Sequence, residues 1–389
     1  MQTSARTAAW PAMLLGAILV LMLHAVPARA ADDGPIDMNR AKSLYQKKQK
    51  GEALTADEQA YLDRALQERN KRQGGERPGG NPGANPNGRA PRSVGKPTTG
   101  MVPLTELGTG SYKGQDGGLY GGGLNEPPAA LQAAATVALK QIQPLNTEGR
   151  PADDGRIVLI SISMSNATHE FSTFKPLADR DPEKSGKLAI VDCAQSGMAM
   201  AEWSRPDANT WREAERRLKE AGVTPAQVQV AWIKLANKHP GGELDAHGKK
   251  LQADAERVVN NAKQLFPNLR IGYLSSRIYG GYADGNLNPE PFAYEGAFAV
   301  RWLIQDQVRG KSELNYDPAR GEVRAPVLLW GPYLWADGTT PRKGDGLVWN
   351  REDLADDGVH PSGSGREKVA QMLLKYFKTD PNAKSWFLK

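Results

Sequence analysis

The sequence predicts an α/β protein, built as a three-layer α/β/α domain around a five-stranded parallel sheet. Strand-like apolar runs alternate with helical patterns along most of the chain, which is the order that produces a parallel sheet with helices on both faces. Most of these strand-like runs are continuously apolar, as strands covered on both faces require. A chain of 389 residues is long enough for one large α/β domain with additional segments.

The five predicted strands are residues 156–161, 187–192, 228–233, 269–274 and 325–330. Helical patterns lie between them, at roughly 209–221, 244–266 and 294–308, and a last helix is predicted at 365–377. A capping box, Ser364-Gly365-Arg366-Glu367, marks the start of that last helix. Ligands of such sheets bind beyond the carboxyl ends of the strands, so the loops that follow the strands are the places to search for a site.

The first 30 residues have the pattern of a signal peptide. Arg6 precedes an apolar run over residues 13–23, which is short for a membrane span, and a small-x-small cleavage site ends at Ala30. We therefore predict an exported protein, periplasmic or extracellular after cleavage near Ala30, with no membrane attachment of the mature chain. An uncleaved membrane anchor is the alternative.

Three segments follow the signal peptide. Residues 31–72 predict a helical hairpin, whose second helix opens with a capping box from Thr55 to Glu58. Residues 73–100 are rich in Gly, Pro and Asn with almost no large apolar residues, which predicts a disordered linker. Residues 101–389 remain as the main domain.

Charge and residue counts exclude several classes of function. The net charge is +6, but residues 101–389 hold 35 basic and 35 acidic side chains, so we expect no nucleic-acid partner for this domain. The histidines are too scattered for a metal site. The glycine-rich residues 101–124 match neither phosphate-loop pattern. We therefore predict no cofactor and no metal, and no obligate protein partner is evident.

Three serines, Ser161, Ser163 and Ser165, alternate along the end of the first predicted strand. Ser165 lies just past the carboxyl end of that strand, where a helix can begin and where backbone N–H groups and the helix dipole favour negative charge. It is therefore the candidate nucleophile. A helix-capping serine is the alternative.

A serine nucleophile needs a base, and His360 is the candidate. Asp357 precedes it by three residues across Gly358, a spacing that lets the carboxylate fold back onto the imidazole and hold its tautomer. A polar turn before the last helix is the alternative interpretation. His169 is four residues from Ser165 and could be only structural. Cys193, the single cysteine, is interpreted as a small buried apolar residue rather than a nucleophile.

These motifs resemble the SGNH (GDSL-like) hydrolase superfamily over roughly residues 155–377. That family has a flavodoxin-like fold, a nucleophilic serine after the first strand and an Asp-x-x-His pair near the C-terminus, which Ser165 and Asp357-Gly358-Val359-His360 match in order and context. Its oxyanion donors follow the second and third strands. Ser196-Gly197 and Asn237 stand at the matching positions.

The sequence departs from the family pattern in two blocks. Ser163-Met164-Ser165 replaces Gly-Asp-Ser, and the third block keeps only Asn237, with Leu235 in place of its glycine and Lys238 in place of its aspartate. Asn237 is therefore in doubt as an oxyanion donor, and Asn166 is a possible substitute. Loss of one such donor costs about 10²–10³ in rate.

The resemblance implies acyl transfer through a Ser-His-Asp triad, and hence an exported serine esterase. Aromatic residues at the ends of the fourth and fifth strands and in the segments after them suggest a flat stacking surface for sugars, and the alternative is that half or more of them belong to the core. They are Tyr279, Tyr282, Trp330, Tyr333, Trp335 and Trp349. We select Arg277, Tyr279 and Trp335 as substrate-binding residues. The predicted substrate is a small molecule or polysaccharide that carries O-acetyl or other short acyl groups. The alternative is a non-catalytic carbohydrate-binding protein on the same scaffold.

Overall fold

The computed structural model describes residues 36–49, 54–55, 57–62, 64–65 and 95–389. The predicted signal peptide and most of the predicted linker lie outside these residues. Contacts divide the chain into two units, residues 1–90 and 91–389, and each is described by itself. Within the described part of the chain, no helix combines the length and the apolarity that crossing a bilayer requires.

The N-terminal unit contains α1 (Met38–Gln49) and a second helical stretch over residues 57–62 and 64–65. The second stretch opens with a capping box, because the Glu58 N–H donates to Thr55 Oγ1 (3.2 Å) and the Thr55 N–H donates to the Glu58 carboxylate (2.9 Å). Lys47 of α1 pairs with Glu58 at 3.1 Å. The two stretches share a small buried core formed by Ala41, Leu44, Tyr61, Leu62 and Ala65.

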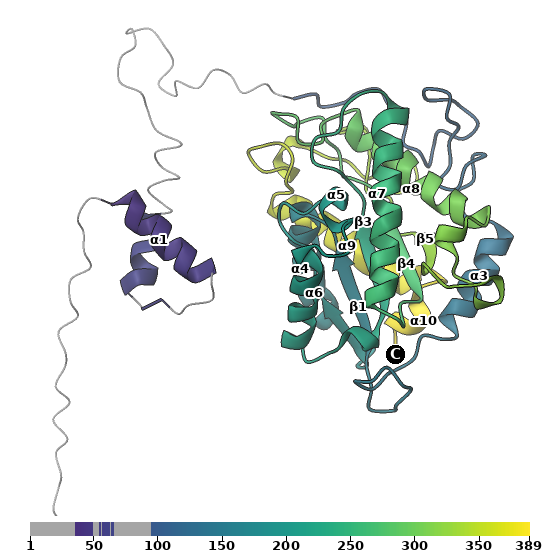
Figure 1. Ribbon diagram of the computed structural model, residues 1–389. Coiled ribbons are helices and arrows are strands. Elements are labelled where there is room, and N and C mark those ends of the chain that lie inside the picture. Colours follow the sequence, from purple (N-terminus) through teal and green to yellow (C-terminus); the bar gives the residue numbers. More distant parts are fainter. Residues whose placement is uncertain (1–35, 50–53, 56, 63, 66–94) are drawn as a thin grey trace, which may run out of the picture. The chain divides into compact units, whose positions relative to one another are not determined.

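The second unit is built on a five-stranded parallel sheet in the order β2-β1-β3-β4-β5 (Figure 1). This confirms the predicted fold class, and the strand order is that of flavodoxin-like sheets. The strands are β1 (Ile157–Ile162), β2 (Leu188–Val191), β3 (Val228–Lys234), β4 (Ile271–Ser275) and β5 (Val327–Trp330).

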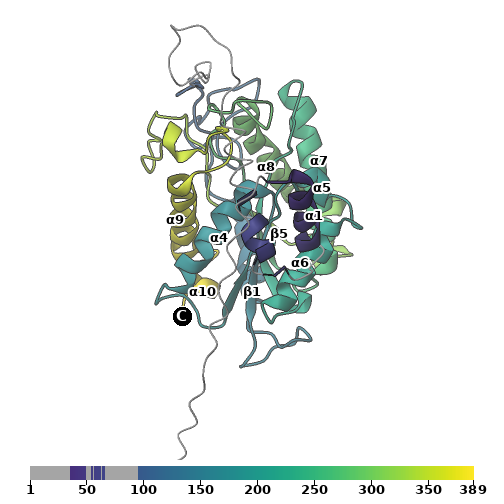
Figure 2. The same cartoon turned by 90° about the vertical axis from the view of Figure 1, so that its left-hand side faces the viewer.

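Helices cover both faces of the sheet. The helices of this unit are α3 (Ala129–Leu139), α4 (Ser165–Asp179), α5 (Met200–Trp203), α6 (Asn209–Glu220), α7 (Leu244–Leu265), α8 (Phe292–Val308), α9 (Gly363–Thr379) and α10 (Lys384–Phe387). Short 3₁₀ turns are η1 (Pro225–Gln227), η2 (Ser312–Leu314), η3 (Pro318–Arg320) and η4 (Arg351–Asp353). Figure 2 shows α4 and α9 together on one side of the strands, with α5, α6, α7 and α8 on the other.

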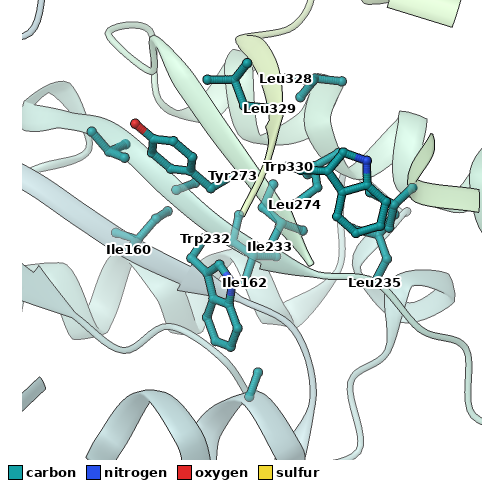
Figure 3. Packing of buried hydrophobic residues seen from close by; sticks show 14 of the residues in the cluster. Ile160, Ile162, Trp232, Ile233, Leu235, Tyr273, Leu274, Leu328, Leu329 and Trp330 are labelled. Carbon is teal, nitrogen blue, oxygen red and sulfur yellow. The ribbon is translucent and has the colours of Figure 1, made fainter. Parts of the chain in front are cut away.

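The core lies between these layers. Strands β1 and β3 are buried at every position, and Figure 3 shows bulky side chains of β3, β4 and β5 packed around the sheet. The Trp232 ring of β3 stacks on Phe171 of α4 with centroids 5.7 Å apart. On the other face, a Cβ at Gly248 of α7 would lie 2.8 Å from the Trp302 ring of α8. Glycine is therefore required for the close approach of these two helices.

Two local details differ from the sequence prediction. Helix α9 is capped by Ser362, whose Oγ accepts from the Gly365 N–H at 3.5 Å, so the predicted capping box that starts at Ser364 is wrong. Ser364 instead donates to the Asp353 carboxylate (2.9 Å). Residues 95–100, placed by the sequence in the linker, bond to the domain, for example from the Lys96 N–H to the Gly281 carbonyl (2.7 Å).

Candidate active site

The three serines near the end of β1 have different surroundings. Ser161 Oγ donates to the Asp192 carboxylate (2.5 Å) and accepts from the Cys193 N–H (3.0 Å). Ser163 Oγ donates to the Lys234 carbonyl (2.5 Å). Both side chains are fully buried and tie β1 to its neighbours β2 and β3. Ser165, in contrast, lines an open cleft at the carboxyl edge of the sheet.

Ser165 is the first residue of α4. The N-cap is Met164, which has an extended backbone and makes no side-chain capping bond, so Ser165 does not have the capping role that was the alternative. Its Oγ lies 2.7 Å from His360 Nε2. Because β1 ends three residues earlier, the chain turns directly from the strand into the helix, and the hydroxyl is held at the positive end of the helix dipole.

His360 is oriented by Asp357. Its Nδ1 lies 2.5 Å from Asp357 Oδ2, while Asp357 Oδ1 accepts from the backbone N–H groups of Val359 (2.9 Å) and His360 (3.0 Å). Partial burial raises the pKa of Asp357, but the hydrogen bonds from the His360 ring and from these two N–H groups outweigh it and hold that pKa well below its usual range. The carboxylate is thus ionised at neutral pH.

Two contacts fix the turn that carries this pair. Gly358 has φ +65°, and a Cβ there would lie 1.7 Å from the Tyr282 carbonyl oxygen, so no other residue fits this backbone position. Asn166, the second residue of α4, donates from Nδ2 to the Val359 carbonyl at 2.9 Å. The helix that carries Ser165 therefore also holds the turn that carries His360.

Backbone N–H groups at two positions are available to bind an oxyanion. Within the described residues, the N–H groups of Ser165 and Gly197 have no hydrogen-bond acceptor. Gly197 lines the cleft with φ +77°, and no atom lies within 4 Å of the position of a Cβ. The Ser165 N–H belongs to the first turn of α4, where helices leave their donors unpaired.

The side chains predicted as further donors are partly engaged elsewhere. Asn237 Nδ2 donates to Asp254 Oδ2 (2.7 Å), and its Oδ1 accepts from the Ala201 N–H (2.9 Å). Asn166 Nδ2 is engaged by the Val359 carbonyl, as described above. Both asparagines line the cleft, and an amide nitrogen carries two N–H groups, so the second N–H of each remains a candidate donor.

His169 also belongs to this site, which sequence reasoning missed. It lines the cleft, and its ring centroid is 5.7 Å from that of His360. Burial, followed by the positive charge of Arg366, lowers its pKa, so the ring is neutral at neutral pH. The spacing of four residues from Ser165, which places both side chains on one face of a helix, was the signal available in the sequence.

A buried ion pair lies beneath the cleft. Lys234, at the end of β3, contacts both carboxylate oxygens of Glu170 on α4 at 2.5 and 2.6 Å, and both side chains are fully buried. Burial raises the pKa of Glu170 and lowers that of Lys234 to about 8. The pair fastens α4, the helix that begins with Ser165, to β3.

Of the three predicted substrate-binding residues, only Arg277 lines the cleft. Tyr279 and Trp335 are fully buried. Tyr279 donates to the Lys96 carbonyl (2.6 Å) and Trp335 donates to the Glu290 carboxylate (2.7 Å). The prediction of an aromatic stacking surface is wrong because these loops fold onto the domain and pack their rings against one another. The other buried aromatic residues of the predicted surface are Tyr282, Trp330, Tyr333 and Trp349.

The cleft has a volume of about 380 Å³, which is within the range of small-molecule sites. Ser165, His360, Gly197 and Arg277 come from loops after β1, β5, β2 and β4 respectively. Among the described residues, no group of three or more His, Cys, Asp or Glu side chains is arranged to hold a metal ion.

No protein-family model matches the chain, and no curated protein sequence matches it. Among solved structures, a candidate acylhydrolase from Bacteroides fragilis NCTC 9343 is similar over 64% of this chain and 97% of its own, with 13% identity and a TM-score of 0.31. The periplasmic domain of a lipopolysaccharide acetyltransferase from Salmonella serovar Paratyphi A is similar over 64% of this chain and 96% of its own, with 10% identity and a TM-score of 0.31.

Proposed function

We propose that the protein is a serine esterase of the SGNH type that removes short acyl groups from a polar alcohol of the carbohydrate class. The observation that carries the proposal is the continuous chain from Ser165 Oγ through His360 to Asp357, with contacts of 2.7 and 2.5 Å. Such a nucleophile, base and orienting carboxylate within hydrogen-bond reach are the requirements of acyl-enzyme chemistry.

In this mechanism, Ser165 Oγ attacks the ester carbonyl carbon while His360 Nε2 takes the hydroxyl proton. Asp357 accepts from Nδ1 and stabilises the imidazolium that forms. The backbone N–H groups of Ser165 and Gly197 bind the oxyanion. His360 then donates its proton to the leaving alkoxide, and the alcohol departs. A water molecule, deprotonated by His360, attacks the acyl-enzyme and releases the carboxylic acid.

The lining of the cleft supports a short acyl group and a polar leaving alcohol. The cleft, with a volume of about 380 Å³, has room for a short acyl group, and Met164, Leu287 and Val359 provide aliphatic contacts for it. Its polar members include Ser196, Asn288 and Lys238, which suit hydroxyl groups. Because the predicted aromatic surface is buried, the preference for a carbohydrate is supported by these polar groups and not by ring stacking.

The test is hydrolysis of p-nitrophenyl acetate by the wild type and by Ser165→Ala. We expect Ser165→Ala to lower kcat by at least about 10³-fold, because the residual oxyanion donors alone catalyse weakly. Ser172→Ala is the matched control, since Ser172 is an exposed serine on the same helix that bonds only to the His169 carbonyl. Equal rates for Ser165→Ala and wild type would reject the esterase and leave the non-catalytic binding protein.

A further inference from the structure

Arg277 is a buried cation in the cleft with unused hydrogen-bond donors. It follows β4 by two residues, its side chain is only 2% exposed, and it lines the same cleft as Ser165. Within the described part of the chain, its Nε and Nη2 have no hydrogen-bond partner. Burial lowers the pKa of Arg277, but a guanidinium stays protonated at neutral pH. Because a buried donor without a hydrogen-bond partner is costly, these two nitrogen atoms require an explanation.

The carboxylates of Glu170, Glu290 and Asp357 act on the charge of Arg277, but each is hydrogen-bonded to other groups. Asp357 is held by His360 and the Val359 N–H. Glu170 is held by Lys234 through both oxygens. Glu290 accepts from the Gly280 N–H (2.8 Å), from Trp335 Nε1 (2.7 Å) and from the Tyr294 N–H (3.0 Å). Burial raises the pKa of Glu290 to about 7, which weakens its negative charge. Arg277 is thus positioned among groups that are already satisfied.

Asn288 supplies an unused acceptor in the same cleft. Its Nδ2 donates to the Asn237 carbonyl at 2.9 Å, while its Oδ1 is buried and has no partner among the described residues. Asn288 has a left-handed backbone (φ 55°) and is 5% exposed. A buried acceptor of this kind suits a hydroxyl group of a bound molecule.

The charge of the cleft favours an anion. Among the described residues that line it, none is Asp or Glu, and the two cations are Arg277 and Lys238. Lys238 is paired with Glu202 at 2.5 Å and also donates to the Gly197 carbonyl (3.0 Å). Arg277 differs from it, because its Nε and Nη2 have no hydrogen-bond partner among the described residues. A planar guanidinium fork matches a carboxylate in shape and in charge, whereas a doubly charged phosphate would need a second free cation.

We propose that the ester cleaved at Ser165 is carried by an acylated hydroxy acid, such as an O-acylated sugar acid. Arg277 binds the carboxylate of this substrate, and a hydroxyl group of the substrate donates to Asn288. This inference depends on the proposed esterase function for the cleavage itself. The recognition of the carboxylate does not depend on it, because the anion would bind in the same cleft whether or not Ser165 is reactive.

The kinetic test compares O-acetylated glucuronic acid with O-acetylated glucuronamide, which has the same shape without the charge. Acetate release gives kcat/KM for each compound. We expect the wild type to prefer the acid by about 10- to 100-fold, as charge-assisted hydrogen bonds predict. In Arg277→Gln the ratio of kcat/KM for acid and amide should fall to about one, mainly because KM for the acid rises. Arg277→Lys should keep part of the preference for the acid.

Two kinetic results would overturn the inference. One is a wild type that hydrolyses acid and amide equally well. The other is an Arg277→Gln enzyme that loses rate on both compounds in parallel and keeps the ratio, which would give Arg277 a role in oxyanion binding or folding. If circular dichroism shows that Arg277→Gln does not fold, the acid-to-amide ratios of kcat/KM for the wild type and Arg277→Lys test the inference instead.

A binding test separates this inference from the esterase proposal. Calorimetric titration of Ser165→Ala with glucuronate and with glucuronamide measures recognition without turnover. Tighter binding of glucuronate, lost in Ser165→Ala/Arg277→Gln, supports the inference even if no ester is hydrolysed. Equal binding of acid and amide contradicts it even if the protein proves to be an esterase. Tighter binding of glucose 6-sulfate than of glucuronate would overturn the assignment to a carboxylate.

Discussion

Ser161, Ser163 and Ser165 carry the same hydroxyl group in three different environments. The first two donate to Asp192 and to the Lys234 carbonyl, so their oxygens are committed to holding strands together. Ser165 alone meets an imidazole, at 2.7 Å. The hydrogen-bond partner, rather than the residue type, therefore distinguishes a candidate nucleophile from a structural serine.

Replacement of Asp357 is predicted to affect kcat more than KM. Asp357→Asn should lower kcat on p-nitrophenyl acetate by about 10²–10⁴, because the amide no longer serves as an anionic acceptor for the His360 Nδ1–H and can favour the wrong tautomer. KM should change little, since Asp357 orients the base and the ester is bound elsewhere. Steady-state kinetics at neutral pH measure both constants. A kcat within threefold of the wild type would contradict the role of Asp357.

The same substitution has a consequence for stability. The folded pKa of Asp357 is lower than its ordinary value of 3.8, so the ionised carboxylate stabilises the folded state above that value and loses this effect as the pH falls through the folded pKa. Urea unfolding should therefore show Asp357→Asn to be less stable than the wild type at pH 7. The difference should shrink below about pH 4.

At the scale of elements, α4 and the Asp357–His360 turn act as one positioning unit. Helix α4 presents Ser165 and His169 to the cleft, anchors the turn through Asn166, and is itself fastened to β3 by the Glu170–Lys234 pair. The turn can approach Tyr282 only because Gly358 has no side chain. A packed helix and a tight turn hold the Ser165 hydroxyl and the His360 ring at a fixed distance, which short loops alone would not do.

A side chain at position 358 is predicted to lower activity. In Gly358→Ala, the new Cβ would overlap the Tyr282 carbonyl oxygen, so the turn must shift and His360 must move away from Ser165. We expect kcat/KM to fall about 100-fold, as displacements near 1 Å do. Gly363→Ala is the matched control, because Gly363 begins α9 with nothing within 4 Å of its Cβ position. Similar activity for both variants would contradict this account.

For the molecule as a whole, the parallel sheet explains why the site exists where it does. All five strands point their carboxyl ends to one edge, so the loops after β1, β2, β3 and β4, together with the segment after β5, meet there. Residues nearly 200 positions apart, Ser165 and His360, become neighbours without any long excursion of the chain. One edge thus collects the candidate nucleophile, base and oxyanion donors together with Arg277.

The N-terminal segment gives the prediction at the scale of the whole chain. We propose that residues 1–30 direct export and are removed. Expression of the full chain in a Gram-negative host should yield a periplasmic or secreted form. Its N-terminal sequence should begin at Ala31, and its intact mass should equal that of residues 31–389. Retention of residues 1–30 on a membrane-bound product would instead support the uncleaved anchor.

The fold class and the candidate triad residues could be predicted from the amino-acid sequence. Continuous apolar runs and helical periodicity are local signals, and they placed all five strands within about two residues of their observed bounds. The Asp-x-x-His spacing is also local, so the orientation of His360 by Asp357 could be anticipated. The order of the strands then brings Ser165 to that pair.

Which polar and aromatic groups reach the cleft could not be predicted from the sequence, because it depends on packing in the folded domain. Tyr279 and Trp335 are buried by loops that are distant in sequence. Arg277 Nε and Nη2 have no hydrogen-bond partner among the described residues, while Glu170 and Glu290 bond to other groups. Burial and hydrogen-bond partnership depend on packing between remote segments. No pattern within a short window of sequence can specify them.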